Sequence, residues 1–256
     1  KQSMQANSGC GVQFDLHCKH EAVKMTFNRK NTDFVSMTDS DVINSIVSAN
    51  CLTATVEDSH YRHETLVQSG ATDWDFIISR AETNGFLVIL NDKHSVDISK
   101  PQLSQEPALR VKMGESIIDF SATLDAEVQT PSIEASTWDV DDQKLIIEKA
   151  DEYSLQDDRM ISAKQLSETL GQEKQTIFSG SSMNSQALKA WADAKLLKMR
   201  LSAFRGTVSF QGNGLLTPGK LILLEGLSSR YNGNAFVSAV SHEITYGEWK
   251  TTVDFG

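Results

Sequence analysis

The sequence predicts a β-rich α+β protein in which a few helices are inserted between antiparallel strands. Three observations lead to this fold class. Turn dipeptides separate short β-branched and aromatic runs over residues 206–256, similar runs occur earlier in the chain, and apolar residues recur at helical spacing in four places. The 256 residues, 39% of them hydrophobic and 23% charged, are enough for one large or two small domains with a buried core.

Charge and hydropathy narrow the classes of function. The formal net charge of −10 disfavours binding to a nucleic-acid backbone, which needs a basic surface. It predicts a solvated acidic surface and leaves open that acidic residues line a channel or face a basic partner. No apolar run approaches the roughly 20 residues of a membrane-spanning helix. Residues 1–5 are not followed by the apolar core of a signal peptide.

The cysteines bear on the redox compartment. The chain has three, at Cys10, Cys18 and Cys51, without paired spacing. An odd number favours reduced thiols and assembly in the cytoplasm, although a bridge between Cys10 and Cys18 stays open.

The N-terminal third begins with strand patterns and continues with a helix. Apolar and polar residues alternate over residues 12–18 and again over 22–27, which predicts a hairpin or a pair of barrel strands joined by a charged turn. Thr38, followed by acidic residues, is typical of a helix start. Apolar residues at helical spacing follow it, and Asn50 marks the expected end. Strand alternation returns over residues 52–56.

A second helix and a hairpin are predicted next. Thr72 is a good N-cap with Asp75 three residues on, and Trp74, Ile77, Ile78 and Ala81 form one apolar face. Gly85 ends this helix because glycine adopts the left-handed conformation without strain. Residues 86–90 and 95–98 then predict a hairpin across a short polar turn.

The middle of the chain predicts more strands and then the longest helix. Residues 109–113, 117–124 and 132–138 have strand patterns, and we expect them beside the C-terminal strands in one barrel. Residues 139–180 are rich in charged and polar residues, and we expect them to be the least ordered part, with a short helical pattern over 162–170. Residues 185–204 predict a long helix with Arg200 near its C-terminal end.

The final fifty residues carry a resemblance to a known family. The ordered features are Arg-Gly at 205–206, Pro-Gly at 218–219, Asn-Gly at 232–233, Phe-Val-Ser-x-Val-x-His-Glu at 236–243, and Gly-x-Trp-x-Thr-x-x-x-Phe-Gly at 247–256. This pattern resembles the hub of contractile injection machines: the VgrG spike of type VI secretion, the spike of phage-like extracellular injection systems, and the late control protein D-like tail hub of contractile phages. Thr-Asp-Trp-Asp-Phe at 72–76 adds to the resemblance, which extends over roughly residues 17–256.

The resemblance implies an organisation of the chain. A hub of this family has two barrel-like antiparallel β units with an inserted small α/β unit and a long helix. By this likeness residues 1–36 form part of a shortened first barrel, 37–104 the α/β insert, 105–145 with 205–256 the second barrel, and 146–204 a helical connection. The family's needle is expected to begin where this sequence ends, at Gly256.

The resemblance also implies partners and a function without chemistry. Three copies of the chain are expected to form a homotrimeric ring with approximate sixfold symmetry, which joins a hexameric inner-tube protein to a trimeric spike needle or tip protein beneath the baseplate proteins. The hub is expected to assemble in the cytoplasm, to be secreted or injected with the tube, and to meet a target membrane only during injection. No cofactor is implied.

A search for catalytic or metal-binding patterns finds weak candidates. His17, Cys18 and His20 resemble a metal cluster, but strand neighbours such as His17 and Cys18 point to opposite faces. His60 and His63 lack an evident third ligand, and the acids Asp73 and Asp75 suit the start of a helix. Three further groups have structural explanations. Asp139, Asp141 and Asp142 form a solvated charge cluster, and His242 and Glu243, as neighbours on a strand, point apart. Trp138, Trp191 and Trp249 are expected to be core or interface anchors.

No catalytic, metal-binding or cofactor-binding residue is therefore assigned from the sequence. No nucleophile elbow, phosphate loop or dinucleotide fingerprint is present. Two alternatives stay open: a carbohydrate- or protein-binding β module on a cell surface, and a spike-associated hydrolase.

Overall fold

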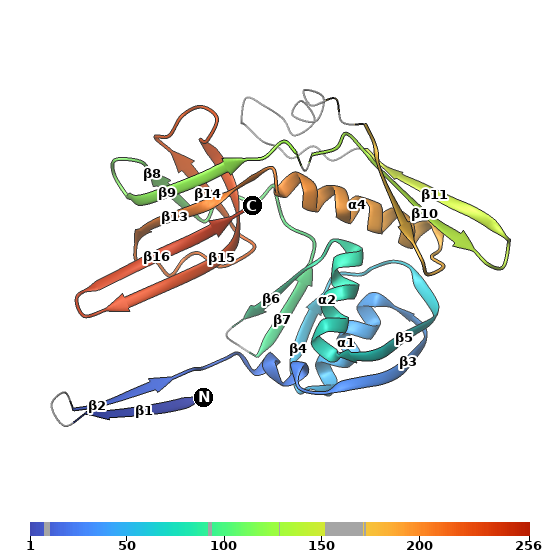
Figure 1. Ribbon diagram of the computed structural model, residues 1–256, viewed down its shortest axis with the longest axis horizontal. Helices are drawn as coiled ribbons and strands as arrows, with labels where there is room; N and C mark the ends of the chain where they lie inside the picture. Colours follow the sequence, from blue (N-terminus) through green and yellow to red (C-terminus); the bar gives the residue numbers. More distant parts are fainter. Residues whose placement is uncertain (8–10, 92–93, 128, 152–170, 172) are drawn as a thin grey trace. The chain divides into compact units, whose positions relative to one another are not determined.

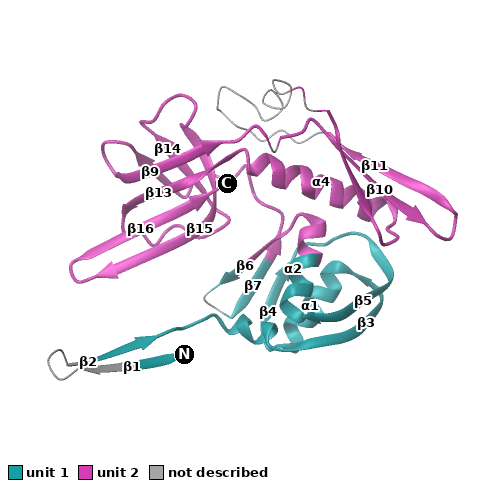
Figure 2. Ribbon diagram, in the orientation of Figure 1, with its two compact units in different colours: residues 1–79, 90–97 teal, residues 80–89, 98–256 magenta. Residues whose placement is uncertain are grey.

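The computed structural model describes residues 1–7, 11–91, 94–127, 129–151, 171 and 173–256. The described chain is β-rich with few helices, which confirms the predicted class (Figure 1). Its internal contacts divide it into two compact units, Lys1–Ser79 with Leu90–Asp97 and Arg80–Ile89 with Ile98–Gly256 (Figure 2). The four segments predicted from the sequence stay a prediction. None of the helices within the described ranges is long and apolar enough to cross a membrane.

The first unit begins with an antiparallel hairpin of β1 (Gln2–Asn7) and β2 (Gly11–Leu16). The strand predicted over residues 12–18 is confirmed in β2, whereas β1 was not predicted because its sequence is polar. Every second residue of β2 points to the same face. The exposed apolar side chains of that face are Val12, Phe14 and Leu16.

The prediction of a second N-terminal strand over residues 22–27 is wrong. Residues 22–27 largely form a 3-10 helix, η1 (Glu21–Thr26), instead of a strand. The His20 ring nitrogen Nδ1 accepts a hydrogen bond of 3.1 Å from the backbone N–H of Ala22, which caps the turn. Ala22 and Met25 are both buried. Residues three apart share one side of a 3-10 helix, so their burial favours this structure over a strand.

A long antiparallel ribbon is the largest strand pair of the first unit. It pairs β3 (Arg29–Thr38) with β5 (Arg62–Thr72). Helix α1 (Asp39–Ala49) follows β3 directly and leads to β4 (Thr53–Val56). The helix starts and stops where the sequence predicts, after Thr38 and before Asn50. Its apolar residues are buried as predicted: Val42, Ile43, Ile46 and Val47.

The second predicted helix and the hairpin after it are confirmed. Helix α2 (Asp73–Asn84) is capped by Thr72, whose hydroxyl accepts a hydrogen bond of 3.1 Å from the backbone N–H of Asp75. Gly85 has a φ of 70° and ends the helix as expected. Strands β6 (Leu87–Asn91) and β7 (Ser95–Ser99) are neighbours in a small sheet of order β4-β7-β6.

The second unit contains a six-stranded half-barrel sheet of order β8-β14-β15-β16-β13-β9. Side chains from both edge strands, among them Val111 and Ile117, join one buried cluster with Val208, Ile222 and Val253, so the sheet curls around its own core. Its strands are β8 (Leu109–Lys112), β9 (Ile117–Leu124), β13 (Phe204–Gln211), β14 (Leu221–Glu225), β15 (Gly233–Thr245) and β16 (Glu248–Phe255). The antiparallel C-terminal strands predicted from the turn dipeptides are confirmed.

A glycine is required where β13 passes closest to its neighbours. A Cβ atom on Gly206 would lie 2.2 Å from the backbone oxygen of Ser121 and 2.7 Å from the Cα atom of Ala122, both in β9. Backbone atoms cannot yield as a flexible side chain can, so the Arg-Gly pair serves close strand packing.

A separate three-stranded sheet and one helix also belong to the second unit. The sheet has the order β11-β10-β12, with β10 (Ile133–Asp139), β11 (Lys144–Ala150) and β12 (Gln175–Ser179). Helix α4 (Ser185–Leu201) lies along one face of it (Figure 1). Their shared core consists of Ile133, Ala135, Ala150, Leu188, Ala192 and Leu196.

One expectation about this region is wrong, and another lies outside the described residues. Strand β10 does not join the C-terminal strands, because it pairs with β11 and β12 instead. Part of the stretch 139–180 is regular, since it supplies those two strands. The long helix is confirmed and ends three residues earlier than predicted. The helical pattern predicted over residues 162–170 lies outside the described ranges.

Candidate functional site

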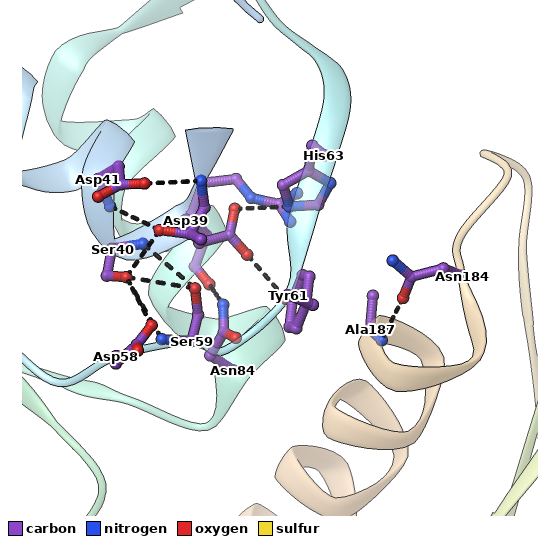
Figure 3. Close-up of polar contacts among 12 residues, drawn as sticks. Asp39, Ser40, Asp41, Asp58, Ser59, Tyr61, His63, Asn84, Asn184 and Ala187 are labelled. Atoms are coloured by element: carbon purple, nitrogen blue, oxygen red, sulfur yellow. Dashed lines mark hydrogen bonds and ion pairs between the residues drawn. The ribbon is translucent and has the colours of Figure 1, made fainter. Parts of the chain in front are cut away.

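The start of α1 holds a buried polar cluster (Figure 3). Asp39 is fully buried, and its two carboxylate oxygens contact the Tyr61 hydroxyl at 2.7 Å and the Nε2 atom of His63 at 3.1 Å. Asp39 is the first residue of the helix, Tyr61 immediately precedes β5, and His63 is the second residue of that strand. The local sequence places the acid here because a carboxylate is stabilised at a helix N-terminus.

The hydroxyl groups near this pair are oriented for structure rather than for nucleophilic catalysis. The Ser40 hydroxyl contacts Thr38 at 3.0 Å and both Ser59 and Asp58 at 3.4 Å. A hydrolytic triad needs a hydroxyl in hydrogen-bond reach of the imidazole that the acid orients. Here the hydroxyls bond one another and the loop, so the cluster fastens the start of α1 to the segment before β5 (Figure 3).

A second buried acid, Asp73, starts α2 and is surrounded by donors. It accepts hydrogen bonds from Lys30 at 2.6 Å, Asn50 at 2.9 Å and Gln68 at 3.2 Å. Burial alone would raise the pKa of Asp73, but these hydrogen bonds outweigh it and hold the pKa below its ordinary value. A carboxyl group held in its charged form is poorly suited to donate a proton.

The sequence candidate that paired Asp73 with Asp75 is not brought together as a catalytic pair. Asp75 is exposed, and its backbone N–H meets the Thr72 hydroxyl in the helix cap. Only Asp73 enters the buried network. Local sequence indicated an acid at a helix start but not its partners, because Lys30 and Gln68 come from strands β3 and β5.

Of the candidate metal ligands near the N-terminus, His20 has other partners. His20 caps η1 through Nδ1, and its Nε2 atom lies 3.1 Å from the backbone oxygen of Asn91. Cys18 and Cys51 are free and exposed, and Cys10 lies outside the described residues. Within the described ranges, no group of three His, Cys, Asp or Glu residues is arranged to hold a metal ion.

His60 and His63 do not share a site. His60 is exposed beside Asp58, at 3.2 Å, while His63 belongs to the buried pair with Asp39. The two residues therefore take part in different contacts on either side of Tyr61.

The acidic cluster between β10 and β11 forms a turn. Asp139 accepts hydrogen bonds from the backbone N–H groups of Asp141 at 3.1 Å and Asp142 at 3.2 Å through one carboxylate oxygen. An aspartate that bonds the backbone two residues on stabilises such a turn.

His242 and Glu243 occupy successive positions of β15, which point to opposite faces. The Nδ1 atom of His242 lies 2.9 Å from the Thr251 hydroxyl, and its ring meets the Trp249 ring edge-on. Glu243 is instead opposite Lys250 in the strand register. The pair is therefore not arranged as a base and its orienting acid.

The most distinctive surface is the side of the β11-β10-β12 sheet that faces away from the core shared with α4. We call it the outer apolar face. It is defined by Trp138, Leu145, Ile147 and Phe178, whose exposed fractions are 49%, 52%, 51% and 63%. In the strand register Trp138 is opposite Leu145, and Ser136 is opposite both Ile147 and Phe178. The four side chains therefore share one face across three strands.

Solved structures show that the fold is that of phage tail and type VI secretion proteins. A tail protein of Neisseria meningitidis matches 100% of this chain and 77% of its own length, with a TM-score of 0.71 and 13% identity. The prophage MuSo2 43 kDa tail protein of Shewanella oneidensis matches 88% of this chain and 67% of its own, with a TM-score of 0.65 and 8% identity.

A third structure links the fold to secretion. It is the c3393 protein of E. coli, described as a component of the type VI secretion system that is structurally similar to the T4 tail proteins gp27 and gp5. It matches 100% of this chain and 58% of its own, with a TM-score of 0.60 and 10% identity. At these identities the likeness concerns the fold alone.

Family membership is set by the sequence. No curated protein matches the chain. A family model described as the Alg8 N-terminal domain matches residues 1–246, nearly the whole length of the chain. The match covers both compact units except for the last ten residues, which contain β16. The chain belongs to the family described as the Alg8 N-terminal domain.

Proposed function

We propose that the chain is a structural hub of a contractile, tail-like injection machine, with no catalytic activity of its own. The observation that supports this most is the likeness to a tail protein along the entire chain, with a TM-score of 0.71. The likeness to a type VI secretion component supports it further. The finer assignment to a VgrG-like or late control protein D-like hub rests on the sequence resemblance over residues 205–256.

The proposed hub contains two barrel-like units. The half-barrel sheet of the second unit is one of them. The β1–β2 hairpin is part of the other, since it exposes an apolar face of the kind that a barrel would bury. Three copies with two such units each would present six similar surfaces to a hexameric tube.

The proposed partners are three other kinds of tail protein. The hub would join the hexameric inner-tube protein to a trimeric needle or tip protein and would contact the baseplate. It would assemble in the cytoplasm and leave the cell with the tube.

The proposal is tested by binding between the purified chain and the inner-tube protein of the same system. We expect co-elution in size-exclusion chromatography and a dissociation constant in the micromolar range or below, as for a specific protein interface. An unrelated ring-shaped hexamer serves as the control. Lack of binding to the tube protein would refute the hub role, and hydrolysis of peptidoglycan or an ester substrate by the chain would refute its lack of catalysis.

A further inference from the structure

Among the described residues of the second unit, the β11-β10-β12 sheet is covered on one face only. Helix α4 shares a core with one face, while the outer apolar face carries four large side chains that are each about half exposed or more. Since an aromatic side chain has about 150–250 Å² of surface and an aliphatic one less, their exposed parts add up to roughly 400 Å². Apolar patches of this size on single chains are often functional.

Two features of the strands favour a helix as the occupant of this face. Strands β10 and β12 pair in parallel, and parallel strand pairs occur mostly in sheets that carry helices on both faces. Strand β11 contains the continuous apolar run Leu145–Ile147, which is typical of a strand that is buried on both faces. Strand β10 has seven residues and spans roughly 23 Å, so a helix of roughly 15 residues matches its length.

The charge at one end of the face favours a basic helix. The turn beside Trp138 holds three acids, Asp139, Asp141 and Asp142, against one base, Lys144. Lys144 pairs with Asp142, and the hydrogen bond and charge of Asp142, followed by the charge of Asp139, raise the pKa of Lys144. Asp141 is exposed, and the described residues give it no ion-pair partner. The turn therefore keeps an excess of negative charge that attracts Lys or Arg.

The other end of the face offers no unpaired cation among the described residues. Lys149 contacts Asp151 at 2.9 Å, and Lys174 contacts Glu134 at 2.6 Å. An anionic membrane would require an excess of Lys and Arg around the face. A second copy of this chain, with its net charge of −10, would be repelled by the acidic turn.

We propose that the outer apolar face binds a basic amphipathic helix of another protein. The apolar stripe of that helix would cover Trp138, Ile147 and Phe178, and its Lys or Arg residues would lie beside the acidic turn. The inference goes beyond the proposed function, because the face would bind such a helix whether or not the chain is a tail hub.

Fluorescence anisotropy of labelled model peptides with the full chain tests this proposal. The probe is a peptide of about 18 residues in which Leu recurs at helical spacing and Lys fills the other positions. One control has the same residues in scrambled order, and the other has Glu in place of Lys. We expect a dissociation constant in the micromolar range for the probe, at least about tenfold weaker binding of both controls, and weaker binding of the probe as salt is added.

Substitutions on the face and away from it locate the binding. Trp138→Ala should raise the dissociation constant of the probe at least about tenfold, because a tryptophan at the centre of an interface commonly supplies much of its binding energy. Trp249→Ala is the matched control, because Trp249 is similarly exposed on β16 of the half-barrel, and it should leave binding unchanged. Asp141→Asn should weaken binding about threefold at low salt, whereas Asp33→Asn, at an exposed acid on β3, should not.

Several results would overturn the proposal. They are equal binding of the probe and either control peptide, equal effects of Trp138→Ala and Trp249→Ala, and equal effects of Asp141→Asn and Asp33→Asn. Slow acrylamide quenching of Trp138 in the free chain, assigned by comparison with Trp138→Phe, would also overturn it, because the face would then be covered within the chain.

Other occupants of the face give distinct outcomes. Self-association in sedimentation velocity that Trp138→Ala abolishes would assign the face to a second copy. Binding to phosphatidylglycerol vesicles that Trp138→Ala abolishes would assign it to a lipid surface, and either result overturns the proposal. Binding of the chain to the tube protein without binding of the probe would leave the hub role standing and remove only this inference.

Discussion

Removing the buried carboxylate of Asp73 should destabilise the first unit by about 3 kcal/mol. In Asp73→Ala, the side-chain amides of Gln68 and Asn50 each lose the hydrogen bond to the carboxylate. They retain their hydrogen bonds to the backbone oxygens of Ala71 and Ile46, respectively. An unsatisfied buried donor costs about 1–3 kcal/mol, and Gln68 is almost fully buried. Lys30 is 45% exposed, so its ion pair adds at most about 1 kcal/mol.

Urea unfolding followed by far-UV circular dichroism measures this difference. Asp75→Ala is the control, because Asp75 occupies the same first turn of α2 but is exposed, and it should lose less than about 1 kcal/mol. A free energy of unfolding for Asp73→Ala within about 0.5 kcal/mol of that control would refute the account of the buried network.

The pH dependence of stability gives an independent check. The pKa of Asp73 is lowered in the folded chain, so its contribution is present above the unfolded pKa of about 3.9 and is lost as the pH falls through the folded value. The difference between the unmutated chain and Asp73→Asn should therefore be constant near neutral pH and shrink below about pH 4. A difference that grows on acidification would contradict this sign.

Three further substitutions test other parts of the fold by the same unfolding measurement. Gly206→Ala should lower the free energy of unfolding by about 3 kcal/mol or more, because its Cβ would collide with the backbone of β9. A decrease below about 1 kcal/mol would show that the strands separate easily. Thr38→Ala removes the capping box of α1 and should lower the free energy of unfolding by about 1 kcal/mol, whereas Thr38→Ser should lower it much less. Arg200→Met removes the guanidinium that donates a hydrogen bond of 3.1 Å to the side-chain oxygen of the buried Gln129, and it should lower the free energy of unfolding by about 2 kcal/mol. An unchanged unfolding midpoint would mean that water replaces the guanidinium.

Helix boundaries could be predicted because they depend on nearby residues. Thr38 and Asn50 bound α1, and Thr72 and Gly85 bound α2, each through contacts within four residues. The same holds for the turn at Gly219, whose φ of 86° the Pro-Gly dipeptide indicated.

Strand pairing was harder to predict because its partners are distant in the chain. Strand β12 pairs in parallel with β10 although some forty residues separate them, and no local pattern encodes that register. Strand β11 was not predicted because its apolar residues do not alternate with polar ones. Leu145 and Ile147 lie on its outer face, whereas Ile146 packs against the core on the other face. For this reason the outer apolar face could not be assembled from the sequence, although Trp138 was recognised as a core or interface anchor.

The buried acids were only half predictable. The sequence placed Asp39 and Asp73 at helix starts, where an acid is expected. Their partners Tyr61, His63 and Lys30 come from segments about twenty to forty residues away, and only the folded chain brings them together.

The pairing of β9 with β13 has a consequence for the segment that connects the two strands. Leu124 is directly opposite Phe204, and the backbone N–H of Asp125 bonds to the carbonyl oxygen of Ala203 at 2.9 Å. The excursion that carries β10, β11, β12 and α4 thus leaves and rejoins the half-barrel at neighbouring points. A short loop could bridge that gap, so we expect a variant that lacks the excursion to keep the register between β9 and β13.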